Sequence, residues 1–264
     1  MRNDGVLRIY TDGGCAGNQS EENLGGWGAI LEYGRPGAAG SGAGAAAPGA
    51  SGAGKAAAES GGVATKELHG CEANTTNNRM EMTALLEAFR AIKKENQTIE
   101  VFSDSSYLMD CFRKKWYVNW QKNGWRNAQR KPVENQDLWK ELLPYLQRHR
   151  INFYRVKGHV RLGAFSLSAF SPGDEGPGSV HSAGGCEAAV GQSAGGCEAA
   201  VGQSAGGCEA AVKLRSAKEA ELKKLYSKFC EWNGNGFTFR EFIHITMRNN
   251  RADELANIGI DEIR

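Results

Sequence analysis

The sequence predicts an α/β fold in which helices flank a mixed five-stranded sheet. Three β-prone runs follow one another in the first part of the chain, and after them amphipathic helices alternate with further strands. Consecutive strands can pair as antiparallel hairpins, whereas strands separated by a helix pair in parallel. With 264 residues, of which 41% are hydrophobic, the chain can bury a sizeable core. We therefore expect one sheet with an antiparallel part and a parallel part.

The antiparallel part rests on three β-prone runs near the N-terminus. They cover residues 7–11, 26–33 and 66–73. A helix is predicted over residues 79–95, because its apolar side chains recur every 3.6 residues. These side chains are Met82, Leu85, Leu86, Phe89 and Ile92. Thr76 or Asn77 stands where an N-cap is expected, so this helix should begin directly after the third strand.

The parallel part alternates strands with helices. A short strand is expected over residues 99–102, and a helix should follow from about residue 106. Asn135 is in position to cap a second helix over residues 136–148, in which Pro144 predicts a kink or an early stop. The last strand should cover residues 151–156.

The C-terminal part predicts an inserted helical hairpin over residues 216–245. Two capping boxes mark its helices, Ser216-x-x-Glu219 and Thr238-x-x-Glu241. The first helix has an apolar stripe of Leu222, Leu225 and Phe229. A separate last helix should open at Asn249 or Asn250. Because the apolar stripe must be buried, we expect the hairpin to dock near the functional site.

Two segments have too little apolar bulk to fold alone. Residues 35–64 contain 21 Gly or Ala in 30 positions and no aromatic residue, which predicts a flexible insertion. Residues 161–215 form a second insertion, which includes a tandem 11-residue repeat (SAGGCEAAVGQ) over residues 182–212. Each repeat offers one Val, so stacked repeats would have almost no core, and we interpret them as a linker. The remaining residues predict a single domain, so that residues 1–264 form one domain with two insertions.

Composition indicates where the protein is located in the cell more than what it does. The formal charge of +2 is too small to establish a nucleic-acid partner. No run approaches the roughly 18 apolar residues of a membrane span. We expect no leader before the first apolar run, and the three cysteines of the repeat, which recur every 11 residues, show no metal-ligand spacing. We expect a cytoplasmic protein with reduced thiols that acts as a monomer away from membranes.

Four acidic residues stand at the ends of predicted elements. Asp12 and Asp104 each follow an apolar strand, Glu81 lies in the first turns of a helix, and Asp253 begins the last helix. Glu81 shares a helix face with apolar residues, where a carboxylate is costly unless it is paired or binds a metal. Ligands in such folds gather where the strands end. Four clustered carboxylates would suit Mg²⁺, with Mn²⁺ as an alternative.

Taken singly, each of these residues has an ordinary explanation. An Asp after a strand is commonly a turn residue or a helix cap. Glu81 could simply favour the N-terminal end of its helix. The basic run over residues 113–131 holds seven Lys or Arg, no acid and four aromatic residues, which fits a solvated helix as well as a nucleic-acid surface. The functional interpretation therefore depends on the joint pattern.

Five motifs in one order resemble those of type 1 ribonuclease H. They are IYTDGGCAGN at residues 9–18, TTNNRMEM at 75–82, VFSDSSY at 101–107, VKGH at 156–159 and NNRADELAN at 249–257. The framework that carries them covers about two thirds of the chain. The resemblance implies a ribonuclease H-like fold. It also implies an endonuclease that hydrolyses the RNA strand of RNA–DNA hybrids.

The resemblance implies a catalytic centre with two Mg²⁺ ions. The family's metal-binding carboxylates fall on Asp12, Glu81, Asp104 and Asp253, with Asp12 bridging both ions. One ion would activate water and the other would stabilise the leaving 3′ oxygen, giving 5′-phosphate and 3′-hydroxyl ends. His159 matches a histidine that assists proton transfer or product release. In isolation, a loop histidine could equally be a surface residue.

The resemblance also implies contacts to both strands of the hybrid. The RNA 2′-hydroxyl would be read by residues after the first motif and at the helix start, although Asn78 could also serve only as a helix cap. The residues expected to contact the hybrid are Cys15, Gly17, Asn18, Thr76, Asn77, Asn78, Asn119, Trp120, Lys122, Trp125 and Asn249. Most of the aromatic and basic ones lie in the run 113–131, which resembles the family's DNA-gripping protrusion.

The sequence departs from the family at three places and leaves two rivals. The loop after the first motif is long, an insertion separates the second and third strands, and a larger one separates His159 from Asp253. Asn74 stands where some members have Arg, which would weaken a phosphate pocket at Thr76 and Asn119. One rival is another nuclease or strand-transfer enzyme of the same superfamily. The other is a non-catalytic hybrid-binding module.

Overall fold

The computed structural model describes residues 5–16, 23–34, 64–162 and 205–262, with side chains from residue 217 onward in the last range. The chain divides into two compact units. One comprises Met1–Gly163 and His244–Arg264, and the other comprises Ala164–Ile243. The second unit takes in most of the predicted insertion 161–215 and of the predicted hairpin 216–245, whereas the predicted insertion 35–64 belongs to the first unit. The expected flexible insertion 35–64 and most of 161–215 lie outside the described residues.

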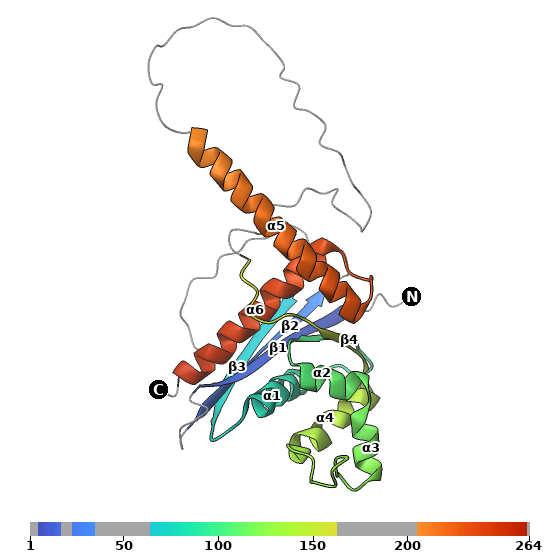
Figure 1. Ribbon diagram of the computed structural model, residues 1–264. Coiled ribbons are helices and arrows are strands. Elements are labelled where there is room, and N and C mark those ends of the chain that lie inside the picture. Colours follow the sequence, from blue (N-terminus) through green and yellow to red (C-terminus); the bar gives the residue numbers. More distant parts are fainter. Residues whose placement is uncertain (1–4, 17–22, 35–63, 163–204, 263–264) are drawn as a thin grey trace, which may run out of the picture. The chain divides into compact units, whose positions relative to one another are not determined.

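A mixed five-stranded sheet forms the centre of the first unit (Figure 1). Its strands are β1 (Val6–Ala16), β2 (Leu24–Gly34), β3 (Ala64–Ala73), β4 (Thr98–Ser103) and β5 (Arg150–Arg155), in the order β3-β2-β1-β4-β5. The first three strands pair antiparallel, and β4 runs parallel to both β1 and β5. The predicted antiparallel and parallel parts are therefore confirmed.

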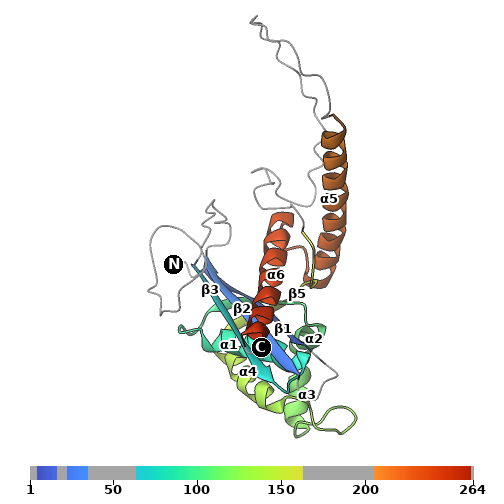
Figure 2. The same cartoon turned by 90° about the vertical axis from the view of Figure 1, so that its left-hand side faces the viewer.

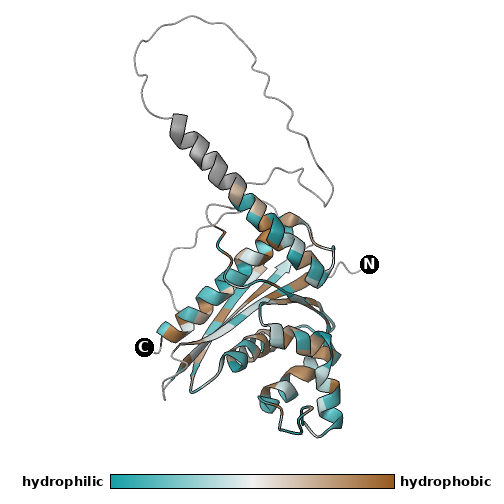
Figure 3. Cartoon of the chain, in the orientation of Figure 1, coloured by the Kyte–Doolittle hydropathy of each residue, from teal (hydrophilic) through white to brown (hydrophobic). Residues whose placement is uncertain are grey.

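Helices cover both faces of this sheet (Figures 1 and 2). Those of one face are α1 (Asn77–Arg90), α2 (Ser106–Arg113), α3 (Trp116–Lys122) and α4 (Gln136–Arg148). Their apolar side chains and the inward residues of β1 and β4 form one buried core around Phe89 and Trp139. On the opposite face, residues 244–261 of α6 (Phe239–Asp261) lie against β2. Figure 3 shows the apolar positions of these helices alternating with polar ones.

Helices α4 and α1 differ in detail from what the sequence predicted. Pro144 does not stop α4, which continues to Arg148, and the side chain of Asn135 makes no capping hydrogen bond because that residue adopts a left-handed backbone with φ 53°. Helix α1 ends at Arg90 rather than near residue 95. Its expected cap is confirmed, because the Thr76 hydroxyl accepts a hydrogen bond from the Arg79 N–H at 3.3 Å.

The second unit contains α5 (Ala205–Asn233) and the beginning of α6. Ser216 lies inside α5 and does not cap it, so the third copy of the repeat, expected as linker, is helical. Ala, Glu, Lys and Leu dominate from residue 208 to residue 224, and these residue types favour helix propagation. The hairpin core is aromatic, with the Phe229 ring 5.3 Å from Phe237 and 5.5 Å from Phe242.

Helix α6 is one continuous helix rather than the two expected. The second capping box is confirmed at its start, where the Thr238 hydroxyl accepts from the Glu241 N–H at 3.2 Å and the Glu241 carboxylate accepts from the Thr238 N–H at 3.0 Å. No Gly or Pro interrupts residues 239–258, so nothing ends the helix before Asn249. Among the described helices, none is long and apolar enough to cross a membrane.

Candidate active site

Asp12 and Asp104 lie side by side at one edge of the sheet. The parallel pairing of β1 with β4 ends at Thr11 and Ser103, and each aspartate is the next residue of its strand. Parallel strands place the residues that follow them at the same edge. Asp12 is only 7% exposed, so its carboxylate is held among protein groups rather than in water.

Glu81 reaches the same edge from helix α1. The helix comes very close to β1 at this point, because a Cβ on Gly13 would lie 2.4 Å from the Met80 carbonyl carbon and 2.5 Å from the Glu81 nitrogen. Only glycine fits directly after Asp12 for this reason. The Ser105 hydroxyl donates a hydrogen bond to the Glu81 carboxylate and accepts one from the Leu108 N–H, so a single side chain both caps α2 and orients Glu81.

Asp253 and His159 complete the cluster from two other elements. His159 Nδ1 lies 3.2 Å from Asp253 Oδ2, and the histidine side chain is 75% exposed. The loop that carries His159 crosses close over Asp104, because a Cβ on Gly158 would lie 1.9 Å from Asp104 Oδ2. The Asn250 side-chain amide holds this loop to α6 by donating to the Val160 carbonyl at 2.7 Å. The loop after β5 and helix α6, which are far apart in the sequence, are thereby joined beside Asp104.

These residues share a single pocket of about 360 Å³. Its lining is Asp12, Gly13, Gly14, Cys15, Asn77, Asn78, Glu81, Asp104, Ser105, Ser106, Tyr107, His159 and Asp253. All four predicted carboxylates, the predicted histidine and three of the predicted hybrid contacts are in this list. The sequence did not single out Ser105, Ser106 and Tyr107, although Ser105 directly follows Asp104 and a serine before a helix is a common cap.

Crowding and burial make the carboxylates reluctant to ionise. Burial first, and then the charges of Asp104 and Asp253, raise the pKa of Asp12 to about 8. Burial raises the pKa of Glu81 to about 7 against the opposing effect of the Ser105 hydrogen bond. Burial also raises the pKa of Asp104, with Asp253 adding to the effect and His159 opposing it. Full ionisation of all four acids would therefore concentrate negative charge in the pocket, and a bound cation would favour that ionised state.

The donor set suits a hard divalent cation. The N–H of Gly13 donates to Asp12 Oδ1 at 2.7 Å, whereas buried Asp12 Oδ2 has no hydrogen-bond partner among the described residues. In the same part of the chain, no three Asp, Glu, His or Cys side chains are arranged as a ready-made metal cage. Mg²⁺ commonly keeps several water ligands and completes its shell with substrate phosphates, so a shared carboxylate pocket fits it better than a closed cage would.

The predicted hybrid-binding residues divide into three groups. Cys15, Asn77 and Asn78 line the carboxylate pocket. Asn119 and Trp120 line a second hollow of about 640 Å³, which also receives Arg126 and Lys131 from the basic run. Thr76 caps α1, and Trp125 has the Lys140 ammonium 5.3 Å from its ring centre. The exposed Lys122 ends α3. Gly17 and Asn18 lie outside the described residues.

Asn249 is placed differently from the other predicted contacts. It is 1% exposed, lies in the middle of α6 and does not line the carboxylate pocket. Neither atom of its amide has a hydrogen-bond partner among the described residues. A direct contact to the hybrid would require this side chain to become accessible.

Comparison with known proteins identifies the family. A sequence profile of RNase H matches residues 4–164. A ribonuclease H of Syntrophomonas wolfei is 42% identical over 151 residues, which cover 57% of this chain and 82% of that protein. A ribonuclease H of Moorella thermoacetica is 41% identical over 153 residues, 58% of this chain and 80% of that protein.

Among solved structures, the chain is similar to LC9-RNase H1, described as a type 1 RNase H with the type 2 active-site motif. It is 31% identical, with a TM-score of 0.45, over 59% of this chain and 64% of that one. The profile match covers more than half of the chain and includes four of the five motifs. The chain belongs to the RNase H family of endoribonucleases.

Proposed function

We propose that this protein hydrolyses the RNA strand of RNA–DNA hybrids with the help of two Mg²⁺ ions and leaves 5′-phosphate and 3′-hydroxyl ends. The observation that carries the proposal is the pocket in which Asp12, Glu81, Asp104 and Asp253 meet beside Asn77 and Asn78. Phosphodiester hydrolysis needs positive charge at the attacked phosphate, and RNA selectivity needs polar groups at the 2′-hydroxyl. One pocket offers partners for both.

The carboxylates would hold the metal ions against the scissile phosphate. Bound there, the ions would supply an activated water and stabilise the charge that develops on the leaving oxygen. Asp12 would be best placed to serve both ions, because the other three acids surround it and one of its oxygens is buried without a hydrogen-bond partner among the described residues. Ser105 would keep Glu81 in the orientation that ligation requires.

His159 would assist by moving a proton at the edge of the pocket. Its exposed ring can exchange protons with water, and its contact with Asp253 keeps one nitrogen near the carboxylates. The left-handed backbone at His159, with φ 53°, places the side chain over the pocket at some cost in conformational energy. We therefore assign it proton transfer or product release rather than metal binding.

Selection of the hybrid would be divided between two surfaces. Cys15, Asn77 and Asn78 would contact the RNA sugars, because amide groups can both donate to and accept from a 2′-hydroxyl. The hollow lined by Asn119, Trp120 and the basic side chains would hold the DNA strand, through stacking on sugars and ion pairs with phosphates. The remaining expectations, a cytoplasmic location and a monomeric state, stay predictions.

The experiment that tests this function is cleavage of a labelled RNA–DNA hybrid. We expect cleavage in Mg²⁺, none in EDTA, and none of double-stranded DNA or double-stranded RNA of the same sequence. The end groups follow from treatment of the product with a phosphatase and a ligase. Binding of the hybrid without cleavage in any divalent metal would instead identify a non-catalytic hybrid-binding module.

A further inference from the structure

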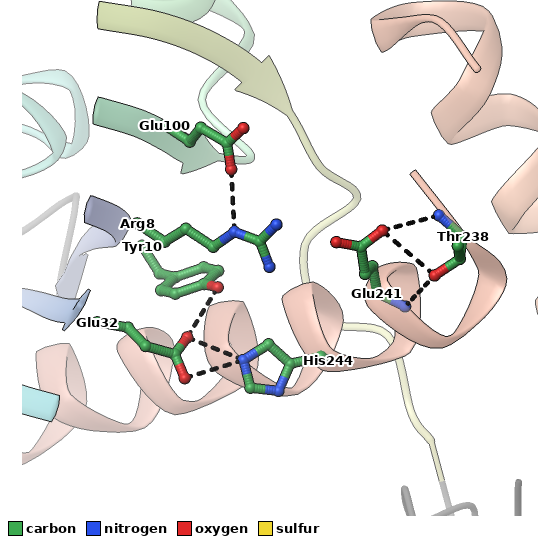
Figure 4. A network of polar contacts seen from close by, with 7 residues as sticks. All are labelled: Arg8, Tyr10, Glu32, Glu100, Thr238, Glu241 and His244. Carbon is green, nitrogen blue, oxygen red and sulfur yellow. Dashed lines mark hydrogen bonds and ion pairs between the residues drawn. The ribbon is translucent and has the colours of Figure 1, made fainter. Parts of the chain in front are cut away.

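A buried carboxylate on β2 binds α6 at a distance from the pocket. Glu32 is 5% exposed, and its carboxylate accepts hydrogen bonds from the Tyr10 hydroxyl at 3.0 Å, from His244 Nε2 at 2.8 Å and from Arg248 Nη2 at 3.2 Å. Figure 4 shows the Tyr10 and His244 side chains converging on it. Two of its three partners belong to α6, the helix that carries Asp253.

Small residues form a further part of this helix–sheet contact. A Cβ on Gly26 would lie 2.0 Å from the Ala256 carbonyl oxygen, and one on Gly28 would lie 2.2 Å from that of Ala252. The helix backbone therefore approaches β2 closely at these two glycines. Helices are normally fixed along their axis by side chains that interlock with the opposing surface. Glycine and alanine provide little of this interlocking.

Two other polar links, made by α6 and by Glu262 directly after it, are more exposed than the Glu32 carboxylate. The ion pair of Arg251 with Glu67 has side-chain exposures of 38% and 36%, and that of His69 with Glu262 has 32% and 59%. Exposed pairs of this kind hold geometry weakly, because water competes for both partners. The Glu32 carboxylate, with a side-chain exposure of 6%, has no such competition. Breaking a buried pair is far more costly.

We propose that Glu32 is a positioning residue for hydrolysis: by holding His244 and Arg248 it fixes where α6 lies along β2, and so where the Asp253 carboxylate lies in the pocket. The inference rests on the proposed function. Arg248 precedes Asp253 by five residues, about 7.5 Å along a rigid helix. A misplacement on the order of 1 Å can cost roughly a hundredfold in rate.

The first variant is Glu32→Gln, which keeps the shape of the side chain but turns an N–H₂ group toward donors. We expect kcat on a labelled hybrid to fall at least tenfold while KM stays within threefold, because Glu32 touches no predicted hybrid contact. Glu100→Gln is the matched control. It removes an ion pair to Arg8 at 2.9 Å on the same face of the sheet but leaves the Glu32 carboxylate and its hydrogen bonds in place, and kcat should stay within twofold.

A second variant and two measurements guard against a simple loss of folding. His244→Phe keeps an aromatic ring beside Tyr10, whose ring centre lies 6.3 Å from that of His244, but removes the N–H that donates to Glu32. This variant should also lower kcat. Hydrogen exchange should accelerate in residues 244–253 of both variants and stay unchanged in α1. Mg²⁺ titration of the substrate-free protein, followed by amide NMR shifts around Asp12, should show several-fold weaker binding.

Three outcomes are separable. Loss of kcat in Glu32→Gln and His244→Phe, with KM and Glu100→Gln unchanged, supports the proposal. A Glu32→Gln protein that cleaves as fast as Glu100→Gln, or that loses only KM, overturns it while the proposed function stands. A wild-type protein that cleaves no hybrid defeats the proposed function itself, and the Mg²⁺ titration and hydrogen exchange then still report whether Glu32 positions the acidic site.

Discussion

The Asp12 carboxylate lies buried between three other acids, with one oxygen bound to the Gly13 N–H and the other without a partner among the described residues. Its raised pKa means that its charge opposes folding at neutral pH. The same charge is what a cation would need. At this position stability and function make opposite demands, as is common at active sites.

Asp12→Asn should therefore stabilise the protein in EDTA. We expect an increase of about 1 kcal/mol or more in the free energy of unfolding at pH 7, since each unit of a raised carboxyl pKa corresponds to about 1.4 kcal/mol. Millimolar Mg²⁺ should raise the melting temperature of the wild type and not that of the variant, because a ligand stabilises only the state that binds it. Thermal melts of both proteins with and without Mg²⁺ check this. A destabilised variant in EDTA would contradict it.

Glu32 shows the opposite behaviour. Burial alone would raise its pKa, but the hydrogen bond and charge of His244, together with Arg248 and Tyr10, lower it from 4.5 to about 2. A lowered carboxyl pKa stabilises the fold above the unfolded value, and this contribution is lost as the pH falls from about 4.5 toward 2. The stability difference between wild type and Glu32→Gln should thus be largest near pH 7 and shrink below pH 4. Urea unfolding at several pH values measures it, and a constant difference would exclude the mechanism.

Among the elements, the strands and α1 followed closely from the sequence because their signals are local. The Thr76 cap and the apolar period placed the start of α1, and five β-prone runs became five strands. The continuity of α6 was not predicted from the sequence. Asn249 or Asn250 suggested the cap of a separate helix, although no residue near them ends the preceding one. Pro144 was expected to kink α4 or stop it early, and α4 does not stop there, because the buried Trp139, Leu142 and Leu143 hold that helix in place.

The basic run behaves as an element of its own, α3 with its flanking turns. Neutralising Lys114, Lys115 and Lys122 together to Gln should raise KM and flatten the salt dependence of hybrid binding by about one to three units of slope, with less effect on kcat. Lys114 is paired with Asp110 at 2.8 Å, so its share should be the smallest. Fluorescence binding titrations at several salt concentrations measure the slope.

A matched control uses lysines at the far end of α1. Lys93 and Lys94 follow that helix, more than 12 residues and about 20 Å from its pocket-facing first turn. Replacing both with Gln removes charge without touching α3 and should leave the salt slope close to that of the wild type. An unchanged slope in the α3 triple variant would show that this run does not contact phosphates.

At the scale of the whole molecule, the order of the motifs predicted which residues form the pocket. Contacts between residues far apart in the sequence became visible only in the structure. Asp12, Glu81 and Asp104 are recognisable from strand ends and a helix start. The contact of His159 with Asp253 spans an insertion of about 90 residues, and the Glu32 network spans more than 200. Neither has a local signal, because both depend on how α6 returns to the sheet.

The first insertion should be dispensable. Strands β2 and β3 pair from Leu24 with Ala73 to Tyr33 with Ala64, so their ends are already adjacent where residues 35–63 leave the sheet. Replacing that segment with a short Asn-Gly turn should preserve kcat and change stability by about 1 kcal/mol or less, since loop-closure entropy depends weakly on length. Denaturant unfolding and the hybrid assay check both points. A shortened chain that fails to fold would assign the segment a structural role.

The carboxylate cluster is the proposed cleavage centre, and Asp104→Asn tests that role most directly. The variant should bind a labelled hybrid with a Kd within a few-fold of the wild type and show no measurable Mg²⁺-dependent cleavage, because it lacks one of the four carboxylates proposed to bind the metal ions and keeps the proposed hybrid contacts. Asp261→Asn, at the exposed end of α6, is the control and should cleave normally. Near-normal cleavage by Asp104→Asn under the same conditions would contradict the central claim.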